Sequence, residues 1–138
     1  MLNVQKSDPA TYAVTLAQAK TWLALDHNGY DDMLTDIIIP GAQDLIERAT
    51  GICLTEADIT AEWDSPITRL PFEPWISGDV LADTSTGSIG YKAGYTTGAP
   101  KGLITAMLNL ITHLFENRGD NTIPKQIAIQ LYPYTRNL

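Results

Sequence analysis

The chain has 138 residues, 44% hydrophobic and 18% charged, which suits one domain with a hydrophobic core and excludes an intrinsically disordered protein. Sixteen acidic against nine basic side chains give a net charge of −7, which argues against a protein that binds nucleic acid tightly by neutralising phosphates. No apolar run is long enough to span a membrane, and a single cysteine, Cys53, excludes an internal disulfide and a multi-cysteine metal site.

The first helix is expected after an irregular lead over residues 1–13. This lead has no apolar stretch like that of a signal peptide, which predicts a product in the cytoplasm. Thr15 and Gln18 have the spacing of a capping box, so the helix should run from Leu16 to about Leu25. Its apolar face should consist of Leu16, Ala19, Trp22 and Leu23.

A second helix should begin at Asp31 or Asp32, where a carboxylate stabilises the positive helix end, and stop at Gly51. Pro40 falls inside it, removes one backbone hydrogen bond and should kink the axis. The alternative is two shorter helices that meet at Pro40 and Gly41. The expected buried stripe consists of Met33, Leu34, Ile37, Ile38, Leu45, Ile46 and Ala49.

Beyond Gly51 the pattern shortens to that of strands. Residues 59–64 alternate apolar and polar side chains, residues 67–70 follow a Ser-Pro turn, and residues 88–95 complete a small antiparallel sheet. In the last of these strands Tyr91 and Tyr95 should lie on one face.

The longest helix is expected from Lys101 to Asn117. Pro100 suits its start, and Arg118 with Gly119 suits its end. Its apolar stripe is wider than a surface helix needs, which predicts a central helix. The stripe consists of Leu103, Ile104, Met107, Leu108, Leu110, Ile111, Leu114 and Phe115.

A short last helix should begin near Pro124 and stop at Pro133. Its expected apolar face consists of Ile123, Ile127, Ala128 and Leu131. Together these elements predict one α+β, mainly α domain over residues 1–138. It has a helical core of about four helices, with a small antiparallel sheet inserted between the second helix and the long third helix.

Few residues offer chemistry. His113 and Glu116 lie three apart on the long helix, on one face, and with Asp120 they define an alternative function: a small acidic enzyme or binding module. A metal site needs three or four ligands, whereas the chain has two histidines, so we expect no catalytic residue, no metal and no cofactor. Cys53 is interpreted as a small buried apolar side chain. Residues 26–32 lack the glycine and glutamate positions of a calcium loop.

Two segments favour protein contacts. Residues 70–76 place Phe72 and Trp75 between prolines, where the rings either pack on the core or form an exposed patch for a partner. Residues 132–138 form a tail that either frays or docks, with side chains common at interfaces. With the end of the long helix, the candidate interface residues are Phe72, Trp75, Glu116, Arg118, Tyr132, Tyr134 and Arg136.

A strand, a proline and the long helix follow one another in the run IGYKAGYTTGAPKGLITAMLNLITHLFENR, from Ile89 to Arg118. This block resembles the Y-x-A-G-Y … P … L-[YF]-E-N-R segment of the head–tail connector (adaptor) proteins of long-tailed phages. Other motifs are similar to that family in the same order. They are V-T-L-x-x-A-K at Val14–Lys20, the T-G at Thr50–Gly51, L-P-x-x-P at Leu70–Pro74, and L-x-P-Y at Leu131–Tyr134. Between Pro74 and Ile89 the chain is shorter than the family pattern.

The resemblance implies a structural virion protein that forms an oligomeric adaptor ring between the portal and the tail or stopper. It implies self-association matching the portal's twelve-fold symmetry, and contacts with the portal and with a stopper or tail-completion protein. The location would be the portal vertex of the virion, after a stage in the host cytoplasm. DNA would pass through a central channel without tight binding, which the net charge of −7 suits. No membrane is implied.

Overall fold

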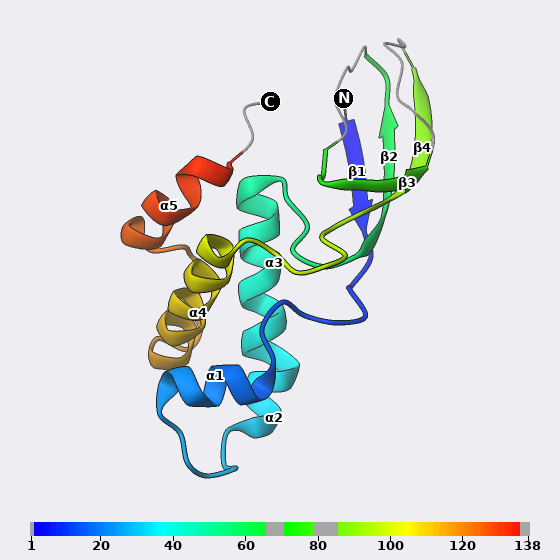
Figure 1. The fold of residues 1–138 in the computed structure, drawn as a ribbon. Coiled ribbons are helices and arrows are strands. Elements are labelled where there is room, and N and C mark those ends of the chain that lie inside the picture. The colour runs from blue at the N-terminus through cyan, green and yellow to red at the C-terminus, as the bar shows by residue number, and fades with distance from the viewer. Residues whose placement is uncertain (1, 66–70, 79–85, 136–138) are drawn as a thin grey trace.

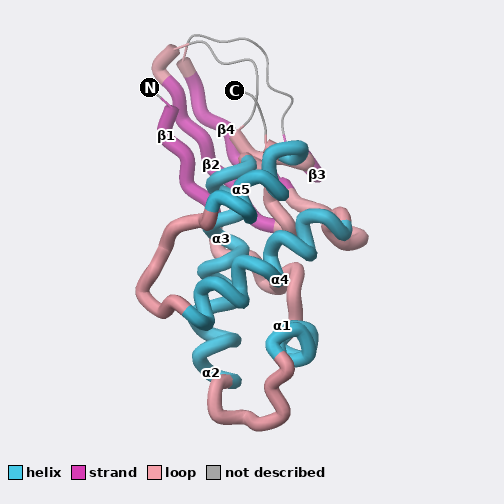
Figure 2. The backbone as a smooth tube through the Cα atoms, turned by 90° about the vertical axis from the view of Figure 1, so that its left-hand side faces the viewer, coloured by secondary structure: helices cyan, strands magenta, loops and turns pink. Residues whose placement is uncertain are grey.

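The computed structural model describes residues 2–65, 71–78 and 86–135. Its helices gather at one end and its strands at the other (Figures 1 and 2). The α+β class is therefore confirmed. In chain order the elements are β1 (Leu2–Lys6), α1 (Leu16–Leu23), α2 (Asp31–Met33), the π-helical η1 (Leu34–Ile38), α3 (Ile39–Thr50), β2 (Ala57–Trp63), β3 (Trp75–Gly78), β4 (Gly87–Ala93), α4 (Lys101–Glu116), α5 (Lys125–Leu131) and the 3-10 turn η2 (Tyr132–Tyr134).

The sheet has the order β1-β2-β4-β3, and its neighbouring strands are all antiparallel. The expectation of an irregular lead over residues 1–13 is wrong at its start, because β1 pairs with β2 and places Leu2 opposite Trp63. The sheet is therefore not wholly inserted between helices: one edge strand comes from the amino terminus. The strands expected at 59–64 and 88–95 are confirmed with slightly different bounds, and residues 67–70 lie outside the described residues.

Alternation along β2 and β4 produces a core for the sheet. Both strands bury every second side chain, and these pack with Cys53 and Phe72 in a cluster separate from that of the helices. The prediction that Tyr91 and Tyr95 share one face is wrong. The strand ends before Gly94, whose φ is +134°, and Tyr95 packs against the helical cluster instead. A Cβ at Gly94 would collide with the carbonyl of Thr55, so glycine is required there.

The helix α4 is central, as its wide apolar stripe predicts. It contacts α1, η1, α3 and α5, and Leu110 is fully buried. The first helix has the predicted capping box, in which Thr15 Oγ1 accepts from Gln18 N at 3.2 Å and Gln18 Oε1 accepts from Thr15 N at 2.9 Å. In the ranges that the structure describes, none of the helices is long and apolar enough to cross a membrane.

Residues 31–50 follow one uninterrupted helical path, so the alternative of two helices separated at Pro40 is wrong. A π-helical turn precedes Pro40, in which Ile39 N–H donates to Leu34 O, and Pro40 itself lies in the first turn of α3. Neither Asp31 nor Asp32 is the cap: Tyr30 holds that position without a side-chain hydrogen bond, and Asp31 pairs with Lys20 at 3.0 Å.

Several side chains expected in the buried stripes are exposed instead. In α1, Ala19 is buried and Leu23 is half-buried, while Trp22, about 100° away from Leu23, is exposed. In η1, the wider π-helical turn shifts the phase of the stripe, and Ile37 is 67% exposed. The exposed side chains that were expected to be buried are Trp22, Ile37, Ala49 and Ala128.

Candidate interaction surfaces

A buried ion pair joins the sheet to the helices. Lys6 at the end of β1 lies 2.9 Å from Glu47 of α3, and their side chains are 4% and 1% exposed. The other carboxylate oxygen of Glu47 accepts from the backbone N–H of Leu54 at 2.8 Å and from Gln43 Nε2 at 3.3 Å. Burial raises the pKa of the Glu47 carboxyl, and these hydrogen bonds together with Lys6 offset part of the rise.

Hydrogen bonds extend this pair into a network. Gln43 Oε1 accepts from the backbone of Ala13 at 2.8 Å, and its Nε2 donates to Thr55 Oγ1 at 2.8 Å. Thr55 Oγ1 in turn donates to the carbonyl of Thr11 at 2.7 Å. The network therefore fixes the segment before α1, helix α3 and the start of β2 against one another, which is a structural role.

Cys53 lies beside this network and is fully buried, as its apolar neighbours predict. Burial, and then the negative charge of Glu47, raise the pKa of its thiol to about 12. The side chain therefore stays a neutral thiol near pH 7 and packs as a small apolar group.

His113 does not pair with Glu116. Its Nε2 lies 3.0 Å from Asp120 Oδ2, across the loop that follows α4, while Glu116 is exposed. Asp120 also accepts from the hydroxyl of Thr122 at 2.6 Å, and hydrogen bonds from Thr122 and His113 lower its pKa to about 2. Across residues 2–65, 71–78 and 86–135, no cluster of three or more His, Cys, Asp or Glu side chains could hold a metal ion. The hydrogen bonds of Asp120 with His113 and Thr122 stabilise the loop that follows α4.

Arg118 stacks on two aromatic rings of its own chain. Its guanidinium lies 5.2 Å from the ring centroid of Tyr30 and 5.3 Å from that of Phe115, and the two rings form an edge-to-face pair. This contact ties the end of α4 to the loop before α2. A role of Arg118 or Glu116 at a subunit interface stays a prediction.

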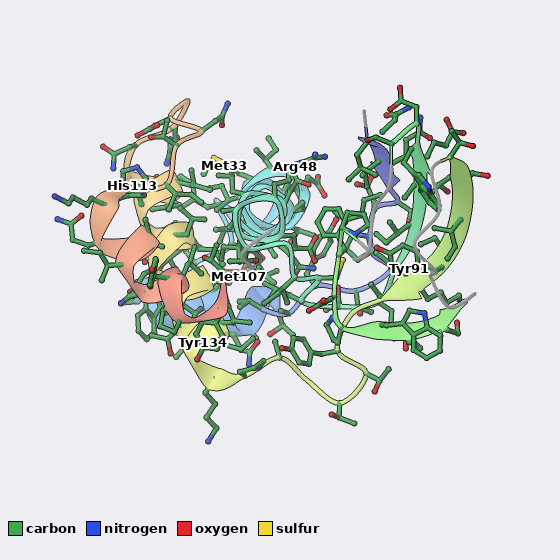
Figure 3. The ribbon with its side chains drawn as sticks, turned by 90° about the horizontal axis from the view of Figure 1, so that it is seen from above. Met33, Arg48, Tyr91, Met107, His113 and Tyr134 are labelled. Carbon is green, nitrogen blue, oxygen red and sulfur yellow. The ribbon has the colours of Figure 1, made fainter. Side chains whose placement is uncertain are left out.

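An apolar groove runs between η1, α3 and the carboxyl end of α4. We call it the α3–α4 groove. Its volume is about 510 Å³, and its lining includes the charged side chains of Asp44, Arg118 and Asp120. Its apolar floor and walls are formed by Met33, Ile37, Ile38, Gly41, Leu45 and Leu114. Met33 and Arg48 lie on one side of α3, whereas Tyr134 lies on the opposite side of the helices (Figure 3).

Phe72 and Trp75 have different environments. Phe72 packs in the core of the sheet, where its backbone N–H donates to the hydroxyl of Tyr91 at 3.0 Å. Trp75, on the edge strand β3, is 49% exposed. Phe72 therefore packs on the core, which was one of the two interpretations of this segment. Of these two rings, only that of Trp75 is exposed enough to contact a partner.

The tail is partly a core element, which corrects the expectation that it only frays or docks. Residues 132–134 extend α5 as a 3-10 turn, and Tyr134 packs against Gly102 of α4 and the helical cluster. Tyr132 is 79% exposed, and Arg136 lies outside the described residues.

A second exposed apolar surface lies on α5. Ile127 and Leu131, four residues apart, are buried, while Ile129 is 64% exposed and Tyr132 follows three residues later. We call Ile129 and Tyr132 the α5 ridge. Sequence reasoning missed Ile129 and the exposure of Ile37. The signal for Ile129 was available, because an apolar residue midway between buried positions of a short helix must point outward.

Comparisons with known proteins agree along the chain. The family model of the phage gp6-like head–tail connector proteins matches residues 13–131. A solved structure titled "Virion of native gene transfer agent (GTA) particle" contains a chain with a similar fold. The TM-score is 0.65 at 18% identity, and the match covers 100% of this chain and 97% of that one. No curated protein sequence matches the chain.

Proposed function

The chain belongs to the phage gp6-like head–tail connector family, and from this premise we propose that it forms the adaptor ring between the portal and the tail. It is a structural virion protein and not an enzyme. In the proposed assembly, copies associate side by side in a twelve-fold ring below the portal and leave a central channel for DNA. A stopper or tail-completion protein binds the opposite face of the ring.

The observation that carries this proposal is the family match over residues 13–131. The fold is compatible with it, because exposed apolar side chains remain on several elements of an otherwise polar surface. The net charge of −7 suits a conduit, since an acidic lining does not retain a moving polyanion. Of the residues behind the alternative of a small enzyme, His113 pairs with Asp120 while Glu116 is exposed, and the matched family is one of structural connector proteins.

The carboxyl-terminal segment is proposed to dock on a neighbouring copy or on the portal. Tyr132 is an exposed amphipathic anchor, and Arg136 can supply a charge-assisted contact. Tyr134 is excluded from this role in our proposal, because its ring packs on α4 of its own subunit.

Co-expression with the cognate portal protein tests the proposal. We expect the two proteins to co-purify, and negative-stain images to show an extra ring on one face of the portal. A chain that stays monomeric at high concentration and does not bind the portal would contradict the proposed function.

A further inference from the structure

The two apolar surfaces defined above stand out by exposure. Among the described residues, the three most exposed large hydrophobic side chains are Ile37 of the α3–α4 groove and Ile129 and Tyr132 of the α5 ridge. One surface is concave and the other is a single helical face. Such a pair matches the mode in which a helix presents residues three or four apart to an apolar groove.

We propose that the α5 ridge of one copy docks in the α3–α4 groove of the next copy in the ring. This inference rests on the proposed ring and names the surfaces that build it. Ile129 and Tyr132 would contact Met33, Ile37 and Leu114 of the neighbour, and each copy would use both surfaces.

Charge complementarity favours a second copy as the occupant. The charged side chains that line the groove are Asp44, Asp120 and Arg118, two acidic and one basic. Residues 121–138, which contain the ridge, carry Lys125 and Arg136 and no acidic side chain. In a chain of net charge −7, two copies repel unless such oppositely charged parts meet. Lys125 is exposed in the first turn of α5, and the exposed Asp32 and Asp36 directly precede the groove residues Met33 and Ile37 in the sequence.

The two surfaces are different, so the contact is heterologous. Contacts of this type repeat from copy to copy and close into a ring when the rotation per step divides a full turn. A two-fold dimer, by contrast, would bring the same surface of both copies together. The groove is lined by η1, α3 and the carboxyl end of α4, whereas the ridge belongs to α5 and the turn after it, so each copy carries two separate surfaces.

Cysteine cross-linking between copies tests the contact. We would make Ile37→Cys and Tyr132→Cys in separate chains, mix them, add a mild oxidant and separate the products without reductant. Cys53 should not interfere, because it is buried with a pKa raised to about 12. A third chain with Trp22→Cys, on an exposed apolar position outside both surfaces, is the matched control.

The expected product is a dimer of Ile37→Cys with Tyr132→Cys, and no dimer of either with Trp22→Cys. A chain that carries both substitutions should give a ladder of larger products. Dimers of Ile37→Cys with itself would overturn the proposal, because they indicate a two-fold contact. A cross-link from position 37 to the portal protein would overturn it too, since another partner would then occupy the groove.

Charged substitutions supply an independent measurement. Ile37→Asp and Ile129→Asp should each weaken self-association by at least about tenfold, measured by sedimentation, while Trp22→Asp should not. A mixture of the two variants retains one intact groove and one intact ridge, so it should form pairs and nothing larger. If rings assemble on the portal with Ile37→Asp, the ridge-in-groove contact is wrong while the adaptor function stands. If the wild-type chain forms no ring, alone or on the portal, both are wrong.

Discussion

The helical half and the sheet half of the molecule are held together differently. The helical cluster is built around one long helix and packs large aliphatic side chains such as Leu103, Met107 and Leu110. The sheet cluster is smaller and mixes alanines and Cys53 with aromatic rings. Between the halves lies the polar network of Lys6, Gln43 and Glu47. This network should be more sensitive to substitution than either apolar cluster, because removing one partner leaves a buried polar group unpaired.

The largest effect is therefore expected at the join. Glu47→Ala should lower the free energy of unfolding by about 3–5 kcal/mol, because it leaves the Lys6 ammonium buried without its carboxylate. This is a large share of the roughly 5–15 kcal/mol typical of a domain. Chemical denaturation measures it. Glu62→Ala, on the exposed face of β2, is the control, and an equally small loss for both variants would show that the join is not critical.

The helical core should come next. Leu110→Ala should cost about 2–5 kcal/mol, because the side chain is fully buried and its removal leaves a cavity. The exposed Ile129→Ala should stay within about 0.5 kcal/mol. A shift of the thermal midpoint by less than about one degree for Leu110→Ala would mean that the helical half does not limit stability.

A smaller effect should separate the two tyrosines after α5. Tyr134→Ala should cost about 1 kcal/mol, because the half-buried ring packs against Gly102 and the helical cluster. Tyr132→Ala should leave the monomer's stability unchanged and weaken only its assembly. Equal thermal midpoints for the two variants would place Tyr134 with the assembly surface instead.

The smallest effect is expected from the loop after α4. The pKa of Asp120 is lowered from 3.8 to about 2 in the folded chain, so its contribution to stability is present above pH 3.8 and is lost as pH falls through about 2. Asp120→Asn should lower the thermal midpoint slightly near pH 5, and the gap to wild type should close toward pH 2. A gap that widens on acidification would contradict this sign.

Features encoded by neighbouring residues could be predicted from the sequence. The capping box at Thr15, the start of α4 after Pro100 and the burial of Leu110 follow from local spacing and periodicity. The expected core and the family motifs depend on such patterns.

Features that depend on distant residues could not be predicted in this way. The alternation of apolar and polar side chains in β1 covers only Leu2 to Gln5, so it is too short to predict a strand, and pairing with β2 decides the conformation. From the sequence alone Glu47 would be expected on the surface, and only the fold brings Lys6 of β1 close enough to pair with it inside. Ile37 fits an ideal helical stripe and leaves it only because of the π-helical turn before Pro40. Tyr134 packs inward because Gly102 leaves room for its ring.

The edge strand β1 also bears on the order in which the chain folds. It is synthesised before the other elements of this fold, yet its backbone partner begins only at Ala57, and the carboxylate that neutralises Lys6 belongs to α3. Helices α1 to α3 can form from local contacts during synthesis, whereas β1 must wait until β2 has emerged. Docking of β1 then completes the sheet edge and buries the ammonium of Lys6 in one event. A segment that is synthesised early therefore reaches its final position late. Chains in which β1 has not yet docked expose an unpaired edge of β2, which can pair with another chain.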